Sequence, residues 1–543
     1  MNFKEVESAQ KLSGSYYTPK WIADYITKWV LEEKSKTILE PSCGDGVFFD
    51  SLSSNINGLF VTGIDTNENA TKACSDKLTK SKVNNEILTK DFITWAIENL
   101  KSDNPKLFDA AVGNPPFIRY QYLEKDIQEN AQIFFEMMDM KFTKHTNAWI
   151  PFVIASIKFL QPNGLLGMIV PSEILHVLYA KGLRDYILDE CSQVLIIDPE
   201  NQWFEGVLQG VVLLMAKKKS HPSQPTQGLA IFKTTDNSFI EESPSDLFNC
   251  ADYVDGDFLK NKWTYALLTA EERRIYNSVC SNENVFSFSS LATADVGIVT
   301  GANKYFLVSD QTVKEYGLED VSHPMFGRSE HCPGIIYNQE QYEENKRKGY
   351  PTNFLYFTSE NDEIKYADYI NEGIKQKLNT RYKCRIRTPW YKVPSVYSSP
   401  ISMLKRSNGM PRLILNEFNA FTTDTAYRVF TKNNIDDKKL VLCFLNTLTA
   451  LSAELEGRHY GGGVLELVPS EIDRLVIPYT SDVNIDIDEL NEFVKTHTME
   501  EVLSRQDDLI LKKIGIENHE IKILQSAFIR IKNRRQHATE AED

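Results

Sequence analysis

Four residues in the first quarter of the chain, Asn114-Pro115-Pro116-Phe117, limit its fold and chemistry more than any other feature. They follow an apolar run, residues 108–113, that predicts a short buried strand. Two consecutive prolines make the following backbone an extended, rigid loop. The loop presents an amide side chain, a backbone carbonyl on Pro115 and an aromatic face. Two acceptors and a ring suit a planar exocyclic amine, although the same letters also suit an ordinary β-turn.

Three upstream segments, residues 36–46, 59–65 and 86–92, predict strands that end in ligand-binding residues. The first runs into a turn whose glycines allow a ligand to approach the backbone closely. Asp65 ends the second, about 20 residues beyond the glycine turn, where a carboxylate can accept from a ribose diol. The third ends in Asp91-Phe92. Residues 36–218 alternate strands and helices, which predicts a parallel, doubly wound sheet whose strand ends converge on one crevice.

This order of motifs resembles that of the S-adenosylmethionine-dependent methyltransferases. The tetrapeptide resembles those that methylate an exocyclic amine of DNA. Residues 14–19, which contain Tyr-Thr-Pro, resemble the segment that γ-class enzymes have before the cofactor-binding strand. Only 70 residues separate Gly44 from Asn114, too few to hold a recognition domain, which excludes the α-class order. The position of Tyr-Thr-Pro argues against the β-class order.

Weaker similarities continue along the chain. Residues 201–207 and 211–216 resemble the last catalytic motif of the γ class, and residues 297–304 and 460–467 resemble segments of its recognition domains. The resemblance therefore implies an α/β fold: a Rossmann-like methyltransferase domain followed by a C-terminal α+β target-recognition domain that ends in helices. The expected divisions are a catalytic domain with a helical lead-in, a recognition domain and a helical region, over residues 1–245, 246–483 and 484–543.

The implied activity is site-specific methyl transfer from S-adenosylmethionine to the N6 amine of a flipped adenine in double-stranded DNA. Asn114 and the Pro115 carbonyl would accept from the amine, within the rigid loop that Pro116 completes, and Phe117 and Phe204 would stack on the base. The expected cofactor contacts are Thr18, Glu40, Pro41, Gly44, Asp65, Asp91, Phe92 and Asn114. Asp65 and Asp91 could instead cap loops, and Phe204 could be an ordinary core aromatic.

Other activities stay open. Cytosine N4 is also an exocyclic amine, and methyltransferases of rRNA or of protein glutamine share the Asn-Pro-Pro-aromatic motif, although they are usually smaller. A non-catalytic DNA-binding specificity protein belongs to a different class. A combined restriction-modification polypeptide would need a nuclease domain, and only 13 residues precede Gly14. A separate cognate restriction endonuclease is a candidate partner, and we expect a monomer on DNA.

The net charge of −15 argues against DNA binding as a global average, but residues 373–412 contain ten basic residues and no Asp or Glu. This run predicts a phosphate-binding surface, with a solvated basic face as the alternative. The expected DNA contacts are Lys383, Arg385, Arg387, Lys405, Arg406, Asn303 and Lys304. Arg385 and Arg387, two apart on an expected strand, should face the same side.

The eight cysteines include no Cys-x-x-Cys pair, so we expect neither a zinc ribbon nor another metal site. The first residues show no signal-peptide pattern, and no apolar run approaches 18 residues. We therefore expect a cytoplasmic protein with no membrane span.

Overall fold

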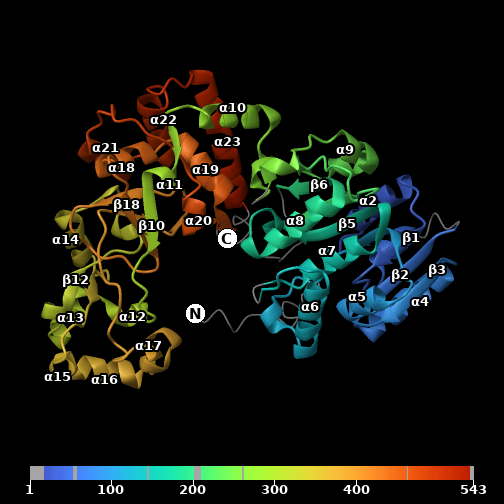
Figure 1. The fold of residues 1–543 in the computed structure, drawn as a ribbon, viewed down its shortest axis with the longest axis horizontal. Helices are drawn as coiled ribbons and strands as arrows, with labels where there is room; N and C mark the ends of the chain where they lie inside the picture. Colours follow the sequence, from blue (N-terminus) through green and yellow to red (C-terminus); the bar gives the residue numbers. More distant parts are fainter. Residues whose placement is uncertain are drawn as a thin grey trace. The chain divides into compact units, whose positions relative to one another are not determined.

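The computed structural model describes residues 18–52, 58–143, 146–200, 203, 210–259, 262–460 and 463–537. Its internal contacts divide the chain between Thr269 and Ala270 into two compact units (Figure 1). Each unit has its own sheet and its own buried core, and each is described by itself below.

The N-terminal unit is built on an eight-stranded sheet with the order β3-β2-β1-β4-β5-β7-β6-β8. Apart from β7, the strands run parallel to one another. This is the expected Rossmann-like α/β arrangement. Its strands are β1 (Thr37–Glu40), β2 (Phe60–Asp65), β3 (Asn84–Thr89), β4 (Phe108–Gly113), β5 (Leu160–Pro171), β6 (Cys191–Pro199), β7 (Val211–Lys218) and β8 (Leu229–Thr234).

The expectation of a parallel sheet is wrong for β7, which pairs antiparallel with both β5 and β6. The apolar run that forms β7 is buried among its neighbours like a parallel strand, so its composition does not show its direction. Chain length does indicate it: β6 ends at Pro199 and β7 begins at Val211. A parallel return needs a crossover of a dozen or more residues, whereas an antiparallel return does not.

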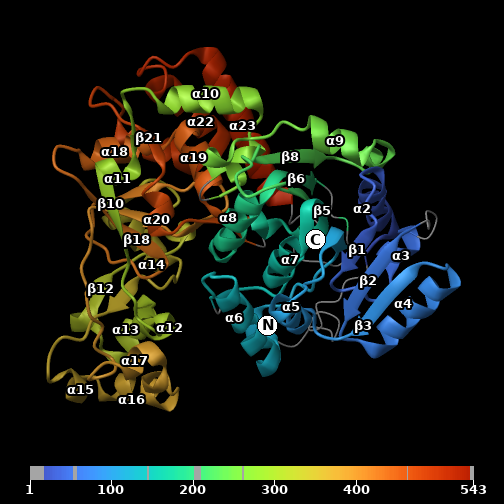
Figure 2. The same cartoon turned by 45° about the vertical axis from the view of Figure 1, so that its right-hand side comes forward.

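Helices cover both faces of this sheet, and Figure 2 shows the two groups on opposite sides of the strands. One group packs through α2 against α3 and α9, and the other through α7 against α5 and α8. The fully buried indole of Trp29, on α2, is part of the core on the first face. The helices are α2 (Lys20–Glu32), α3 (Val47–Leu52), α4 (Glu68–Lys80), α5 (Phe92–Lys101), α6 (Lys125–Met137), α7 (Trp149–Lys158), α8 (Lys181–Glu190) and α9 (Pro244–Cys250).

The C-terminal unit combines short strands with helices. Its largest sheet has the order β10-β18-β15-β17-β13 and is antiparallel except for the β13–β17 pair. Smaller sheets join β11-β14-β12, β16-β20-β19 and β21-β9. The strands are β9 (Val285–Ser287), β10 (Ala292–Val296), β11 (Leu307–Val308), β12 (Ser322–Pro324), β13 (Ile336–Tyr337), β14 (Asn353–Leu355), β15 (Ile401–Leu404), β16 (Arg406–Ser407), β17 (Leu413–Asn416), β18 (Ala426–Thr431), β19 (Arg458–Tyr460), β20 (Val464–Glu466) and β21 (Val476–Pro478).

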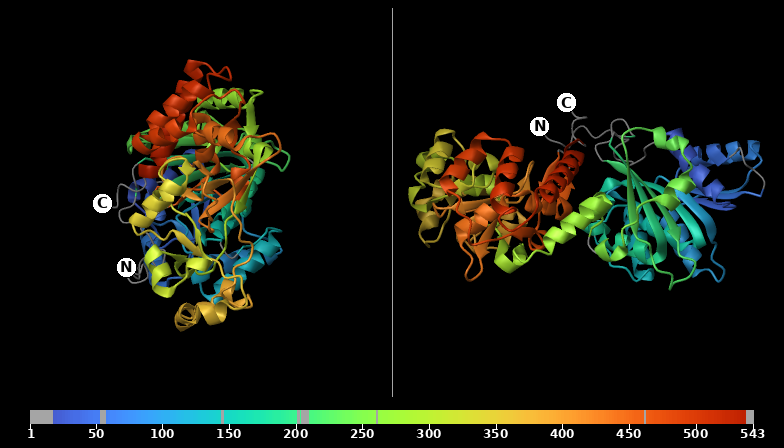
Figure 3. Two further views of the ribbon diagram at one scale, coloured as in Figure 1. Left: turned by 90° about the vertical axis from the view of Figure 1, so that its left-hand side faces the viewer. Right: turned by 90° about the horizontal axis from the view of Figure 1, so that it is seen from above.

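The helices that end the chain belong to this second unit, and they gather there in red in Figure 3. The unit contains α10 (Ala270–Cys280), α11 (Phe288–Leu291), α12 (Asn303–Phe306), α13 (Asp310–Tyr316), α14 (Gln339–Arg347), α15 (Asp362–Lys365), α16 (Ala367–Lys375), α17 (Tyr382–Arg385), α18 (Asp437–Phe444), α19 (Thr447–Glu456), α20 (Pro469–Ile472), α21 (Ile487–Thr496), α22 (Met499–Ile510) and α23 (Asn518–His537). None of the helices in the described part of the chain is both long and apolar enough to span a bilayer.

The observed division differs from the expected boundaries at 245/246 and 483/484. Residues beyond 245 pack with the N-terminal unit, since Val254 forms a β-bridge with Leu229 at the start of β8. The Trp263 backbone N–H also donates to the Leu175 carbonyl at 2.8 Å. The terminal helix α23 is held to α19 by a buried ion pair, in which Arg535 lies 2.6 Å from Glu454. Both side chains are almost completely buried. Such long-range contacts are not visible as a change in composition along the sequence.

This buried pair generates a prediction about stability. Arg535→Met removes the cation and leaves the Glu454 carboxylate buried without its partner, which should cost about 3–5 kcal/mol. Hydrogen–deuterium exchange resolved along the chain should show faster exchange in α19 and α23. The matched control is Lys438→Met, which breaks a solvent-exposed pair with Glu417 and should cost at most about 1 kcal/mol. Unchanged protection in α19 would contradict the role of the pair.

Candidate active site

The carboxyl ends of four neighbouring parallel strands bring most of the predicted site residues to one edge of the sheet. β1 lies between β2 and β4, with Glu40 opposite Gly63 and Leu39 opposite Ala111, and β2 pairs with β3. Because parallel strands end on the same side, the segments that follow them meet there. Ligands of open α/β sheets bind at this edge, so it is the candidate active site.

The turn after β1 is tightly folded around two glycines. The Cys43 N–H donates to the Ile64 carbonyl, and the Gly46 N–H donates back to the Cys43 carbonyl. Gly44 and Gly46 have φ values of +49° and +86°, which strain any other residue. A Cβ on Gly46 would also lie 2.8 Å from the Cys74 sulfur. The backbone of the turn is therefore fixed.

Asp65, at the end of β2, joins this turn to the second strand. Its Oδ2 accepts from the Gly44 N–H at 2.9 Å, and its Oδ1 accepts from the Asn67 N–H at 2.9 Å. Part of the carboxylate therefore has the loop-bonding role that was the alternative to ribose binding. Two carboxylate oxygens offer about four lone pairs, so these two bonds leave capacity for a ligand.

Asp91 likewise caps a helix. It is the N-cap of α5, and its Oδ1 accepts from the Thr94 N–H at 2.7 Å and from the Thr94 hydroxyl at 2.8 Å. Phe92 is the first helical residue, so its backbone N–H has no intrahelical acceptor and is directed out of the helix end. Its ring is buried against Trp95 and Phe152 in the core.

Glu40 is the most unusual titratable group at this edge. Its side chain is 1% exposed, and burial, reinforced by the neighbouring Cys74 and Asp65, raises the pKa of its carboxyl well above the ordinary value of 4.5. Its Oε2 is buried and has no hydrogen-bond partner among the described residues. Buried oxygens of this kind are rare in native structures and indicate a missing hydrogen-bond partner.

The Asn114 loop follows β4 directly and is anchored on both sides. The Asn114 amide donates from Nδ2 to the Thr18 hydroxyl at 3.2 Å, and the Ser42 hydroxyl donates to the Asn114 backbone carbonyl at 3.1 Å. Thr18 belongs to the Tyr-Thr-Pro segment, and Ser42 to the glycine turn. Pro115 is buried, while Phe117 is partly buried against the core. Three motifs identified separately in the sequence are thus directly bonded. Ser42 was not predicted, since nothing in its local pattern marks it.

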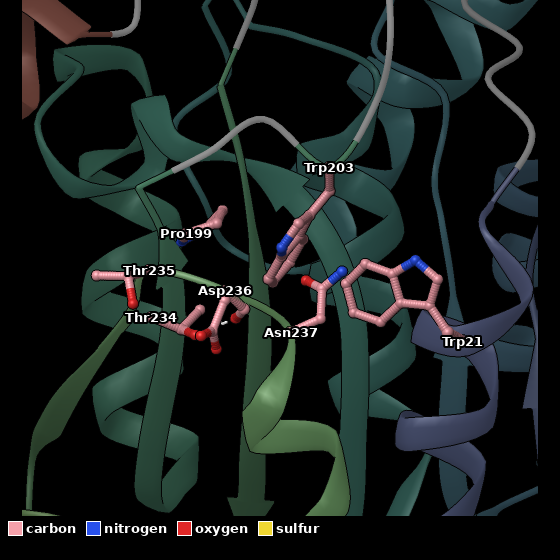
Figure 4. A pocket seen from close by; sticks show the side chains of 7 residues that line it. All are labelled: Trp21, Pro199, Trp203, Thr234, Thr235, Asp236 and Asn237. Atoms are coloured by element: carbon pink, nitrogen blue, oxygen red, sulfur yellow. Dashed lines mark hydrogen bonds between the residues drawn. The ribbon is translucent and has the colours of Figure 1, made fainter.

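A cavity of about 270 Å³ opens at the carboxyl ends of β6 and β8, beside the start of α2. Figure 4 shows Trp203 pointing toward the residues that follow β8, with Asn237 and Trp21 on one side of it and Pro199 on the other. The Trp21 and Trp203 rings meet edge to face at 5.5 Å. Sequence reasoning missed this cavity because its tryptophans are far apart in the chain. The predicted stacking residue Phe204 lies outside the described residues.

The predicted DNA-contacting residues lie in the C-terminal unit and divide into two groups. Some have partners within the protein: Lys405 and Arg406 pair with the buried Glu466 at 3.4 and 2.6 Å, and Asn303 donates to Asp424 at 2.9 Å. Arg387 is also bonded within the protein, to backbone carbonyls. Lys304, Lys383 and Arg385 are instead exposed, and no ion pair to them is found among the described residues. The ten cations are therefore partly neutralised by acids outside the run.

The expectation that Arg385 and Arg387 share one face of a strand is wrong. Arg385 ends the short helix α17, and its N–H donates to the Arg381 carbonyl at 2.8 Å. Arg387 follows the helix and donates to the Thr300 and Val299 carbonyls at 2.7 and 2.6 Å. The segment forms a helical turn instead of a strand, and the buried Cys384 anchors one side of that turn.

The raised pKa of Glu40 generates a prediction. Because its folded-state pKa lies above the unfolded value, the folded state retains the proton and stability falls as pH rises above about 4.5, by at most about 1.4 kcal/mol per pH unit. Glu40→Gln should remove this decline and stabilise the cofactor-free protein at neutral pH. Denaturant unfolding between pH 5 and 8, followed by tryptophan fluorescence, tests it. The fluorescence mainly reports on the N-terminal unit that contains Glu40, because Trp390 is the only tryptophan in residues 270–539. The control is Asp76→Asn, because Asp76 is exposed. If the free energy of unfolding depends on pH in the same way for Glu40→Gln and for wild type, the prediction is wrong.

Comparison with known proteins matches both units. The family model "Eco57I restriction-modification methylase" matches residues 43–204, and "Type II methyltransferase M.Eco57I, C-terminal domain" matches residues 260–511. Type II methyltransferase M.AccI of Acinetobacter calcoaceticus is 23% identical over 94% of this chain and 95% of its own length. Type II methyltransferase M.BanIII of Aneurinibacillus aneurinilyticus is 23% identical over 82% of this chain and 86% of its own length.

Among solved structures, the type IIG restriction endonuclease BpuSI matches 98% of this chain and 67% of its own, with 14% identity and a TM-score of 0.44, too low to add to the assignment. M.AccI is matched nearly end to end, and the two family models match successive parts of the chain, the later part being matched by the model described as a C-terminal domain. The chain therefore belongs to the family of type II restriction-modification methyltransferases.

Proposed function

We propose that this chain transfers a methyl group from S-adenosylmethionine to the N6 amine of an adenine in double-stranded DNA. The observation that supports this most directly is the bonding of Asn114 to Thr18 and Ser42 at the end of β4, beside the glycine turn. One rigid arrangement thereby joins the residues proposed for the target amine to those proposed for the cofactor. The resemblance to γ-class enzymes favours adenine N6 over cytosine N4.

The described residues suit S-adenosylmethionine as a ligand. Glu40 offers a buried oxygen without a hydrogen-bond partner, and a Cβ on Gly44 would meet nothing within 4 Å, so a ligand can approach the turn. We propose that Asp65 accepts from the ribose hydroxyls and that Asp91 and the Phe92 N–H hold the cofactor's adenine. Residues Thr18, Glu40 and Pro41 would lie toward the methionine end.

The bound cofactor would supply an activated methyl group, so the protein needs no covalent intermediate. An exocyclic amine is a poor nucleophile because its lone pair is delocalised into the ring. The Asn114 amide oxygen and the Pro115 carbonyl would accept both N–H groups, which favours a pyramidal nitrogen with a localised lone pair. The Asn114 Nδ2–H bond to Thr18 fixes the plane of the amide, so its oxygen has one defined direction.

The target base must leave the duplex before its amine can be reached in line. Phe117, partly buried beside Asn114, would stack on the extruded base, and Phe204 would take the other face or the edge. Stacking on an aromatic side chain is worth about 1–3 kcal/mol per base, comparable to the cost of unstacking. The C-terminal unit would recognise the sequence, and the enzyme would act as a monomer beside a separate restriction endonuclease.

Two substitutions test the chemistry, one expected to affect methyl transfer and the other expected to affect cofactor binding. Asn114→Ala should lower methyl incorporation into DNA by at least about 10²-fold, the scale of losing an oriented dipole, while cofactor binding stays close to wild type. Asp65→Asn should instead weaken cofactor binding by about 1.5–3 kcal/mol. Radiolabelled methyl transfer and calorimetry separate the two effects. Wild-type transfer by Asn114→Ala would remove Asn114 from the reaction.

Nucleoside mass spectrometry of the methylated DNA identifies the base in the same samples. N6-methyladenine is the expected product. N4-methylcytosine alone would correct the substrate and leave the amine chemistry in place. Incorporation into RNA or protein but not DNA, or no incorporation by wild type, would reject the proposed function in favour of one of the other activities.

The exposed cations of α17 in the C-terminal unit generate a further prediction. Lys383→Ala with Arg385→Ala should weaken binding to all DNA sequences alike and reduce the slope of log affinity against log salt by up to about two, because each phosphate contact contributes about 0.9. The matched control is Lys314→Ala, an exposed lysine already paired with Asp310 on the same helix, which should leave the slope unchanged. An unchanged slope in the double variant would mean that these cations form a solvated face.

A further inference from the structure

Two segments that the sequence analysis identified separately lie against each other in the C-terminal unit. They are the loop of residues 297–301 and the turn of helix α17, residues 381–387. Arg387 donates to the carbonyls of Val299 and Thr300. A Cβ on Gly301 would lie 2.7 Å from the Lys383 Cβ, so only glycine allows this approach. The buried Cys384 belongs to the same core cluster as Ile298, which fixes α17 to the body of the unit.

The opposite side of this turn exposes two large apolar side chains. Tyr382 is 64% exposed and Ile386 is 61% exposed. The Ile386 N–H donates to the Tyr382 carbonyl at 3.4 Å, so the two residues are one helical turn apart and project from the same face. Exposed apolar residues that occur singly need no explanation, but this pair stands on a turn that is rigidly anchored behind it.

Cations surround the pair. Arg381, Lys383 and Arg385 are exposed, and no ion pair to any of them is found in the part of the chain that the structure describes. The Lys383 ammonium and the Arg385 guanidinium lie 5.8 and 6.0 Å from the centre of the Tyr382 ring. In a chain with a net charge of −15, three cations without acidic partners around an apolar tip indicate a polyanionic ligand with apolar layers inside. Stacked bases between phosphate backbones have this structure.

We propose that Tyr382 and Ile386 form a wedge that enters the DNA between base pairs and bends it, while Arg381, Lys383 and Arg385 contact the flanking phosphates. This inference rests on the proposed function, since it takes DNA as the substrate. Proteins that bend DNA insert apolar side chains between base steps and recover the cost of unstacking through the additional contacts that the bend permits. Insertion requires a rigid support, which the buried Cys384 and the Arg387 bonds provide.

The test uses the full chain with Tyr382→Ser and Ile386→Ser combined, which removes the wedge but no charge. Ile364→Ser is the matched control, because Ile364 is 82% exposed on α15 and lies outside the turn. The measurements are affinity for a duplex across a salt series, end-to-end fluorescence energy transfer that reports bending, and methyl incorporation. Circular dichroism checks that each variant is folded.

The double variant should lose at least about tenfold in affinity at an unchanged salt slope, because no phosphate contact is removed. It should also lose the bend that wild type and Ile364→Ser impose. Wild-type affinity and bending in the double variant would overturn the wedge, as would a reduced salt slope, which would assign the pair to orienting the cations. An unbent duplex that wild type binds and methylates would overturn the wedge and leave the proposed function intact. Failure of wild type to methylate DNA at all would instead reject the proposed function.

Discussion

The parallel pairing of β1 with both of its neighbours is the constraint on which the rest of the N-terminal unit depends. Four residues of backbone, Thr37–Glu40, hydrogen-bond to β2 on one side and to β4 on the other. Sliding either neighbour by one residue would reverse which of its side chains face each layer of helices. The glycine turn, the Asp65 carboxylate and the Asn114 loop are therefore positioned by buried strands, and only short loops separate them from that rigid frame.

Sequence reasoning succeeded where local pattern and chemistry agree. Strands with apolar runs, the glycines at positive φ and the amide after β4 were all readable, because each is specified by a few adjacent residues. The direction of β7 could not be inferred from its composition, because a strand buried among its neighbours has the same composition whichever way it runs. Only the short connection from β6 indicates that β7 runs antiparallel. The domain boundaries were also not readable, since the Trp263 and Arg535 contacts join segments that are distant in the chain.

The basic segment shows the same limit in electrostatic terms. A run of ten cations with no acid looks unneutralised along the chain, but Glu466 approaches Lys405 and Arg406 from a different strand. Arg387 is satisfied by two carbonyls, and burial lowers the pKa of its guanidinium. Charge counted along the sequence thus overestimated the surface that faces a ligand. Only the folded chain separates the cations that stabilise the protein from those left to contact a partner.

The contact between Arg387 and the carbonyls of Val299 and Thr300 also limits how segments of this unit can be exchanged between related proteins. Transplanting α17 into a relative without its matching loop would leave a half-buried guanidinium without acceptors, and a side chain at position 301 would collide with Lys383. The two segments should therefore be exchanged between homologues as one module, even though more than 80 residues of sequence separate them. Chimeras joined between residues 301 and 382 would divide this module and, on this view, fold poorly.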